Sequence, residues 1–183
     1  MMTMTNRPCT RTATRLSLAT AAALALVGTA ASSASAASPW TAYRTSEVTV
    51  AAARSTCAFD VRITPLEDEE EYRTTSTWPD GSPRTQVFRG TLVERYTNLS
   101  TEASVVRDLS ATAVFAYRAD GSPESLTSVH GAFGATMPAG STPDTGLYVV
   151  GGHGSRVDFL PDGTRSFTLG SNGTAEDVCD ALD

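Results

Sequence analysis

The sequence predicts an all-β fold, an antiparallel up-and-down β-barrel of about seven or eight strands that ends in a short C-terminal helix. Two observations lead to this prediction. Asp-Gly turn signals recur at residues 80–81, 120–121 and 162–163, between runs that have the composition of β-strands. The intervals between these runs are too short for the crossover helices that parallel strands require. Because a long meander must hide its edges, a closed barrel is the first expectation, and a two-sheet β-sandwich is the alternative.

The first expected core strand begins near Cys57. Phe59, Val61 and Ile63 alternate with polar residues, which places the three on one face of a half-buried strand. Pro65 is expected to end this strand, because proline cannot donate a hydrogen bond to a neighbouring strand.

The remaining strands are placed between turn signals. The acidic run over residues 67–71 is typical of a solvated turn. Further strands are expected over residues 72–77, 85–97, 104–117, 126–137, 147–160 and 164–169. Glycines inside several of these ranges indicate bulges or sharp coiling, which a barrel needs in order to close.

Only the C-terminus has a helical pattern. Thr174 can cap a helix, Glu176 and Asp177 suit its first turn, and Val178 and Leu182 lie four residues apart. A short helix is therefore expected after the last strand.

Residues 1–36 have the pattern of a secretory signal peptide. Three arginines precede an apolar run over residues 16–30, and the small residues Ala34, Ser35 and Ala36 suit a cleavage site. The run is too short to span a bilayer, and no paired arginines precede it, so the Sec route is expected rather than twin-arginine export. The sequence thus predicts a secreted, extracellular protein with no stable membrane insertion after cleavage.

The predicted cleavage leaves an even number of cysteines, because Cys9 lies within the signal peptide. An exported chain with one pair of cysteines is expected to form a disulfide, here between Cys57 and Cys179. Residues 37–54 are rich in Ala, Ser and Thr with little periodicity, which predicts a flexible N-terminal arm. The β-barrel domain is then expected over residues 55–183, with the disulfide joining its start to its end.

Composition excludes several classes of function. The formal net charge of −6 argues against a nucleic-acid partner. All 14 basic residues are arginine, which excludes a Schiff-base lysine and a P-loop lysine. The chain also lacks the His-Glu-x-x-His motif of zinc proteases, the Gly-x-Ser-x-Gly motif of serine hydrolases and a glycine-rich dinucleotide fingerprint. No cofactor and no metal are therefore expected.

The two histidines of the chain are candidates for a site. If residues 126–137 and 147–160 form a hairpin that closes between Met137 and Gly146, His130 lies directly opposite His153 on one face. The alternative is that a glycine bulge shifts this register and leaves both as ordinary strand residues.

Glu94 is the third candidate. It shares a strand face with Leu92 and Tyr96, and its charged side chain breaks the apolar pattern of that face. Together with His130 and His153 inside a barrel, it could form an acid–base or ligand-orienting site. A metal site lacks a clear third ligand.

Four short motifs resemble a family of small secreted proteins from high-GC actinobacteria. They are Cys-x-Phe-Asp-Val at residues 57–61, Thr-Asn-Leu at 97–99, Pro-Asp-Gly at 161–163 and Asp-Val-Cys at 177–179. The chain departs from the pattern at Glu102, where glycine is expected after the Thr-Asn-Leu turn. The resemblance implies a lipocalin-like or allene-oxide-cyclase-like barrel and supplies no reaction.

The first functional expectation is a secreted, non-catalytic barrel that binds a small apolar ligand in its interior. One alternative is a surface interaction or structural protein with a filled barrel. The other is an isomerase- or cyclase-type enzyme that uses His130 and His153. An enzyme is the less favoured reading, because polar residues suited to catalysis are sparse in this chain.

Overall fold

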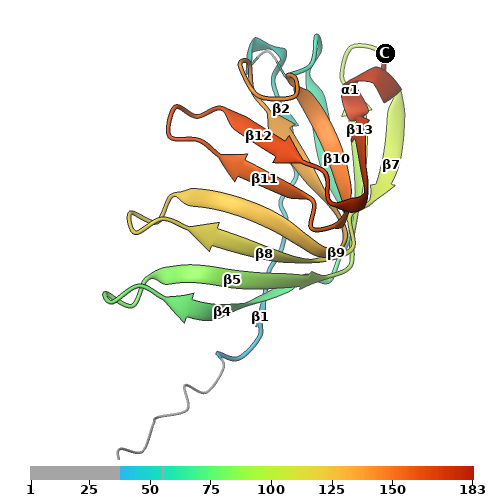
Figure 1. The fold of residues 1–183 in the computed structure, drawn as a ribbon. Coiled ribbons are helices and arrows are strands. Elements are labelled where there is room, and N and C mark those ends of the chain that lie inside the picture. The colour runs from blue at the N-terminus through green and yellow to red at the C-terminus, as the bar shows by residue number, and fades with distance from the viewer. Residues whose placement is uncertain (1–37, 55) are drawn as a thin grey trace, which may run out of the picture. The chain divides into compact units, whose positions relative to one another are not determined.

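The computed structural model describes residues 38–54 and 56–183, and its ribbon is shown in Figure 1. The predicted signal peptide, residues 1–36, lies outside the described residues. No helix in the described part of the chain is long and apolar enough to cross a membrane.

The fold is all-β, as predicted, with one short α-helix at the C-terminus. In chain order, its elements are β1 (Thr41–Ala42), β2 (Val48–Val50), the 3-10 helix η1 (Ala52–Arg54), β3 (Val61–Asp68), β4 (Glu71–Thr77), β5 (Pro83–Gly90), β6 (Leu92–Asn98), β7 (Ser104–Asp108), β8 (Ala111–Tyr117), β9 (Pro123–Met137), β10 (Gly146–His153), β11 (Arg156–Phe159), β12 (Arg165–Thr168), β13 (Ser171–Asp177) and α1 (Val178–Ala181).

The strands pair into two antiparallel sheets rather than one barrel. The nine-stranded sheet has the order β1-β4-β5-β8-β9-β10-β13, with β11 paired to β9 and β12 paired to β11. The four-stranded sheet has the order β2-β3-β6-β7. Figure 1 shows β4, β5, β8 and β9 side by side in the larger sheet. Within the described residues no pairing closes a barrel, so that prediction is corrected, and the two sheets fit the sandwich alternative.

The sheets separate where consecutive long strands bend. The Glu69 amide donates to the Thr91 carbonyl at 2.8 Å, and the Leu109 amide donates to the Leu92 carbonyl at 2.8 Å, so the bends lie side by side. Gly90 has a φ of 139° at its bend, and a Cβ there would lie 2.3 Å from the Glu69 carbonyl oxygen. Only glycine allows this close backbone approach. Before the bend, β5 pairs within the larger sheet, and after it, β6 pairs within the smaller sheet.

The three predicted Asp-Gly turns are confirmed, and each closes a hairpin. In the β4–β5 turn, the Gly81 amide donates to the Trp78 carbonyl at 2.9 Å, and Asp80 Oδ1 accepts from both the amide and the hydroxyl of Ser82. The same arrangement recurs in the β8–β9 and β11–β12 turns. Local side-chain hydrogen bonds thus stabilise all three turns.

Several expected boundaries differ from the structure. The strands expected over residues 85–97, 104–117 and 147–160 are each divided in two, into β5 and β6, β7 and β8, and β10 and β11. Pro65 does not end the first core strand, because β3 continues to Asp68 through a register shift between Pro65 and Glu67. The C-terminal helix begins at Val178, with Asp177 as its N-cap, rather than at Thr174. Residues 174–177 pair with β10 instead, so hydrogen bonding between strands prevails over the local helical pattern.

A flexible arm is expected over residues 37–54, but its described part, residues 38–54, contains two strands. β1 pairs with β4, and β2 pairs with β3 from Val48 opposite Ile63 to Val50 opposite Val61. The segment therefore contributes one strand to each sheet. Its backbone hydrogen bonds to β4 and β3 do not depend on an alternating hydrophobic pattern, which is why the sequence does not predict these two strands.

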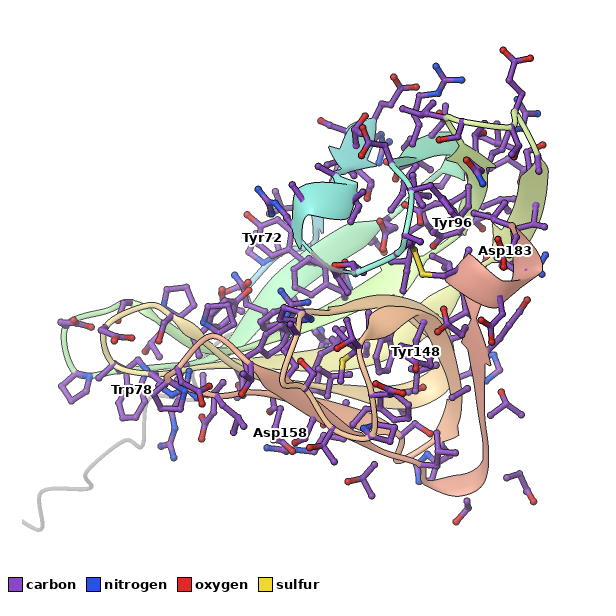
Figure 2. The ribbon with its side chains drawn as sticks, turned by 90° about the horizontal axis from the view of Figure 1, so that it is seen from above. Tyr72, Trp78, Tyr96, Tyr148, Asp158 and Asp183 are labelled. Carbon is purple, nitrogen blue, oxygen red and sulfur yellow. A yellow bond between two sulfur atoms is a disulfide. The ribbon has the colours of Figure 1, made fainter. Side chains whose placement is uncertain are left out.

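The predicted disulfide is confirmed between Cys57 and Cys179, whose Cα atoms lie 5.5 Å apart. Figure 2 shows it as a yellow bond beside the C-terminal helix. Val178 and Leu182 are buried in the same core cluster, and the Asn98 side-chain amide donates to the Leu182 carbonyl at 3.1 Å. The C-terminus is therefore held by a disulfide to the segment before β3, and to the smaller sheet by apolar packing and a buried hydrogen bond.

A candidate ligand-binding cavity

A cavity of ≈ 430 Å³ is lined by residues of both sheets. The smaller sheet contributes Ile63 of β3 together with Leu92 of β6. The larger sheet contributes residues of β5, β8, β9 and β10, such as Ala113 and Leu147. Because most of the lining is aliphatic or aromatic, the cavity offers an apolar surface to a ligand.

Aromatic rings form one wall of the cavity. Phe115 lies 6.2 Å from Phe88 and 4.8 Å from Tyr117, measured between ring centroids. Tyr43, from the segment after β1, meets Phe88 edge-on at 5.5 Å. The alternation of β5 and β8 directs these side chains to the same side of the larger sheet, where they form a continuous aromatic surface.

Glu94 and Tyr96 form a polar group in the opposite wall. Both belong to β6 and, being two residues apart, face the same side as Leu92. Glu94 is 6% exposed and Tyr96 is 1% exposed. The Tyr96 hydroxyl donates to Glu94 Oε2 at 2.7 Å. A carboxyl group thus lies in an otherwise apolar wall with one of its oxygens hydrogen-bonded.

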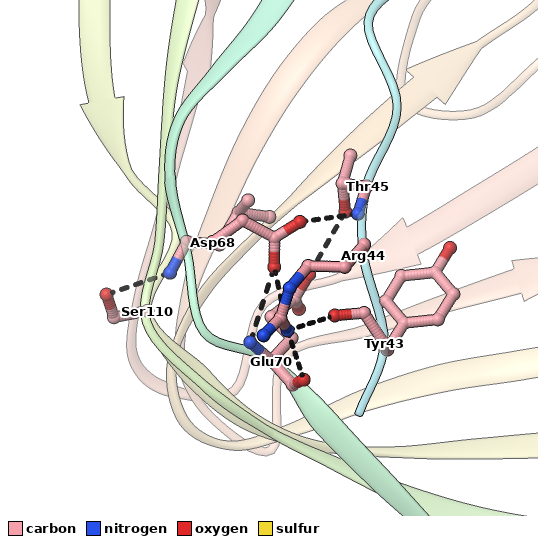
Figure 3. Close-up of polar contacts among 7 residues, drawn as sticks. Tyr43, Arg44, Thr45, Asp68, Glu70 and Ser110 are labelled. Carbon is pink, nitrogen blue, oxygen red and sulfur yellow. Dashed lines mark hydrogen bonds and ion pairs between the residues drawn. The ribbon is translucent and has the colours of Figure 1, made fainter. Parts of the chain in front are cut away.

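A second carboxyl group, that of Glu70, lines the same cavity. The Thr45 hydroxyl donates to Glu70 Oε2 at 3.0 Å, and the Thr45 amide donates to Asp68 Oδ2 at 2.5 Å. Figure 3 shows Thr45 hydrogen-bonded to both carboxylates, with Arg44 beside them. The N-terminal segment therefore holds the acidic run against the cavity.

Burial controls the ionisation of these groups. It raises the pKa of Glu94, an effect that the Tyr96 hydrogen bond opposes and the charge of Asp68 reinforces. It also raises the pKa of Glu70, which the Thr45 hydrogen bond lowers in part and the charges of Asp68 and Glu94 raise further. Burial and the neighbouring Glu94 raise the pKa of Tyr96 as well, so its hydroxyl remains a neutral donor.

The two candidate histidines lie outside this cavity. The predicted register is confirmed from Met137 opposite Gly146 to Ala132 opposite Gly151, where the ladder of β9 and β10 ends. His130 then pairs with Thr112 of β8, and His153 pairs with Ser171 of β13.

Both histidine side chains are exposed, and neither lines the cavity. His153 Nδ1 is hydrogen-bonded to the Val129 carbonyl at 2.9 Å. The positive φ of Gly131, 80°, turns the β9 backbone next to His130. Of the three candidates from the sequence, the structure places Glu94 alone in the cavity wall.

Sequence reasoning missed two polar residues of the cavity. The acidic run predicts a solvated turn for Glu70, and nothing in its pattern distinguishes Glu70 from its neighbours. The alternation places Tyr96 on the apolar face of its strand, and its spacing of two residues from Glu94 is the signal that could identify the hydrogen-bonded pair.

Within residues 38–54 and 56–183, no group of three or more His, Cys, Asp or Glu side chains is arranged to hold a metal ion. Comparisons of the chain with family models, with curated proteins and with solved structures find no match. The functional argument therefore rests on the geometry of the cavity.

Proposed function

We propose that this protein is a secreted, non-catalytic binding protein that holds a small, mainly apolar molecule in the cavity between its two sheets. The observation that carries the proposal is the cavity itself. Its volume of ≈ 430 Å³ falls within the roughly 300–1,000 Å³ that is typical of small-molecule sites. Its wall combines a broad apolar surface with few polar groups, which is also typical of such sites.

Secretion is supported by the signal-peptide pattern and by the disulfide. Disulfides persist in oxidising compartments outside the cytosol. The bond between Cys57 and Cys179 joins the segment before β3 to the C-terminal helix and fits a protein that must remain folded after export.

A non-catalytic role is supported by the polar groups that face the ligand space. They are two carboxyl groups, Glu70 and Glu94, and the hydroxyl groups of a few tyrosines and threonines. Both histidines of the chain lie elsewhere, so the isomerase- or cyclase-type alternative that relies on them has no support from their position.

The proposal is tested by calorimetric titration with a neutral apolar probe, para-phenylbenzyl alcohol. We expect the wild-type protein to bind it, and we expect Ala113→Leu to weaken binding by filling the cavity from β8. Gly134→Val fills the same cavity from β9, because a Cβ at Gly134 would lie 3.4 Å from the Tyr96 hydroxyl. Ala175→Leu, at an exposed position of β13, is the matched control and should bind as wild type does.

Thermal unfolding of each variant verifies that it is folded. Absence of binding of this alcohol and of its charged analogues, described below, to the folded wild-type protein would overturn the proposal and favour a surface interaction or structural role. Equal binding by both cavity variants and by the control would also overturn it, because the probe would then lie elsewhere.

A further inference from the structure

We propose that the natural ligand carries a positively charged amino group, which Glu94 and Glu70 receive while the apolar body of the ligand packs on the aromatic wall. This inference rests on the proposed binding function and adds the chemical class of the ligand. It follows from three properties of the cavity: the sign of its charges, the unsatisfied hydrogen-bonding capacity of Glu94 and the arrangement of its aromatic rings.

The charged side chains that line the cavity are both acidic. Among its lining residues, Glu70 and Glu94 carry ionisable carboxyl groups, and no lysine, arginine or histidine is present. Asp68, beside them, adds a third carboxylate whose charge acts on both. The nearby guanidinium of Arg44 is 3.9 Å from Asp68, and its side chain is 60% exposed, so it lies on the solvent side of the cluster. A cationic ligand would relieve the repulsion among these carboxylates.

Glu94 has hydrogen-bonding capacity that the protein does not use. Its side chain is almost fully buried, and Oε2 accepts from Tyr96. Within the described residues, no side chain or backbone group donates to Oε1, although Glu94 lines the cavity. Oε1 can therefore accept a hydrogen bond from a ligand, and an ammonium group supplies donors together with a compensating charge.

The aromatic wall suits an organic cation better than a metal ion. Tyr43, Phe88, Phe115 and Tyr117 present rings whose faces attract an ammonium group or pack against a hydrocarbon body. A hard metal ion would instead need about six to eight oxygen ligands. Two carboxyl groups among aliphatic and aromatic side chains therefore match an aryl or alkyl amine.

The raised pKa values of Glu70 and Glu94 agree with this assignment. Each group is held above its ordinary pKa by burial and by neighbouring negative charge, which the charge of Arg44 offsets in part for Glu70. No basic residue in the described part of the chain lines the cavity itself, so a bound ammonium group would supply a cation there and stabilise the ionised forms.

Three isosteric probes test the inference at neutral pH and low salt: para-phenylbenzylamine, which is cationic, para-phenylbenzyl alcohol, which is neutral, and para-phenylbenzoate, which is anionic. We expect the amine to bind about tenfold more tightly than the alcohol, because a hydrogen bond to a charged group adds about that factor. The benzoate should bind most weakly, since its carboxylate would face two others.

Variants then assign the preference to the cavity carboxyls. Glu94→Gln should remove most of the advantage of the amine and leave binding of the alcohol within about twofold, because glutamine keeps the size and the hydrogen bond of the side chain but not its charge. Glu70→Gln should have the same effect to a smaller degree. Glu124→Gln is the matched control, because it removes one negative charge from an exposed position of β9 and should leave all affinities unchanged.

The outcomes separate the two proposals. Binding of the alcohol with equal or weaker binding of the amine would overturn the ligand class and leave the binding function standing. An amine preference that survives in both Glu94→Gln and Glu70→Gln would also overturn the assignment. If none of the three probes binds, the binding function itself is overturned.

Discussion

Removal of the Cys57–Cys179 disulfide is expected to lower the free energy of unfolding by about 5 kcal/mol. The bond joins residues 122 apart in sequence. In the chain-entropy relation, closing a loop of that length in the unfolded state costs about 16 cal/mol/K of entropy, or about 5 kcal/mol at 25 °C. The Cα separation of 5.5 Å lies within the ordinary range for disulfides, so the native backbone holds both cysteines at bonding distance.

The assay compares the exported wild-type protein with the double variant Cys57→Ala/Cys179→Ala in urea unfolding and in thermal unfolding. Alanine is chosen because Cys57 is buried, and serine would bury an unpaired hydroxyl there. For a domain of this size, a loss of 5 kcal/mol corresponds to a fall in Tm of roughly 10–20 °C. A reductant should lower the stability of the wild-type protein and leave the double variant unaffected.

A loss of less than about 1 kcal/mol would refute the reasoning, because the unfolded chain would then gain little freedom on reduction. A large effect of the reductant on the double variant would refute it as well. The native contacts of α1 provide an internal check. Val178 and Leu182 pack in the core cluster, and we expect them to stay buried without the disulfide, so the native circular dichroism spectrum should be unchanged at low temperature.

Three further predictions concern the bends, one turn and the cavity. Gly131→Ala should lower the free energy of unfolding by at least about 2 kcal/mol more than Gly81→Ala does. The new Cβ at residue 131 would lie 2.0 Å from the Ser110 carbonyl oxygen, whereas a Cβ at residue 81 would meet open space. Equal losses of stability in urea unfolding would contradict this prediction. Glu102→Gly should raise that free energy by about 0.5–1 kcal/mol, since Glu102 has a φ of 63°, with Glu102→Ala as the control that keeps the strain. Glu94→Gln should gain stability relative to the wild-type protein as the pH rises. Burial raises the pKa of Glu94 in the folded state. The contribution of the Glu94 carboxyl to the free energy of unfolding is therefore complete below about pH 4.5 and is lost as the pH rises through the raised pKa. A stability difference that is constant from pH 4 to 8 would exclude the last prediction.

Much of the local structure could be predicted from the sequence. The Asp-Gly turns follow from residues that act on their own backbone, as Asp80 does when it accepts hydrogen bonds from Ser82. The disulfide follows from counting the cysteines of an exported chain. Glu94 could be singled out because it lies on the apolar face of its strand, where a carboxyl group is expected to be buried and to form a polar site.

The expectations that differ from the structure depend on contacts between distant residues. Pro65 lies within a strand because a shift in register accommodates it opposite β6. Residues 174–177 have a helical pattern but extend β13, because pairing with β10 satisfies their backbone groups. Glu70 is held at the cavity by Thr45, 25 residues away in the chain, so no local pattern could assign it.

The sequence by itself determined the strand-rich class, the hairpin turns and the cysteine pairing, because each depends on residue types and spacings that act over a few positions or on a count. The tertiary structure decided that the strands form two sheets, that Glu70 joins Glu94 in a cavity and that the histidines lie on the surface. The physical reason is the register at the bends. Gly90, with a positive φ, lets two backbones approach closely at the bend where the chain leaves β5 of the larger sheet for β6 of the smaller one, and so helps to determine which side chains face the interior.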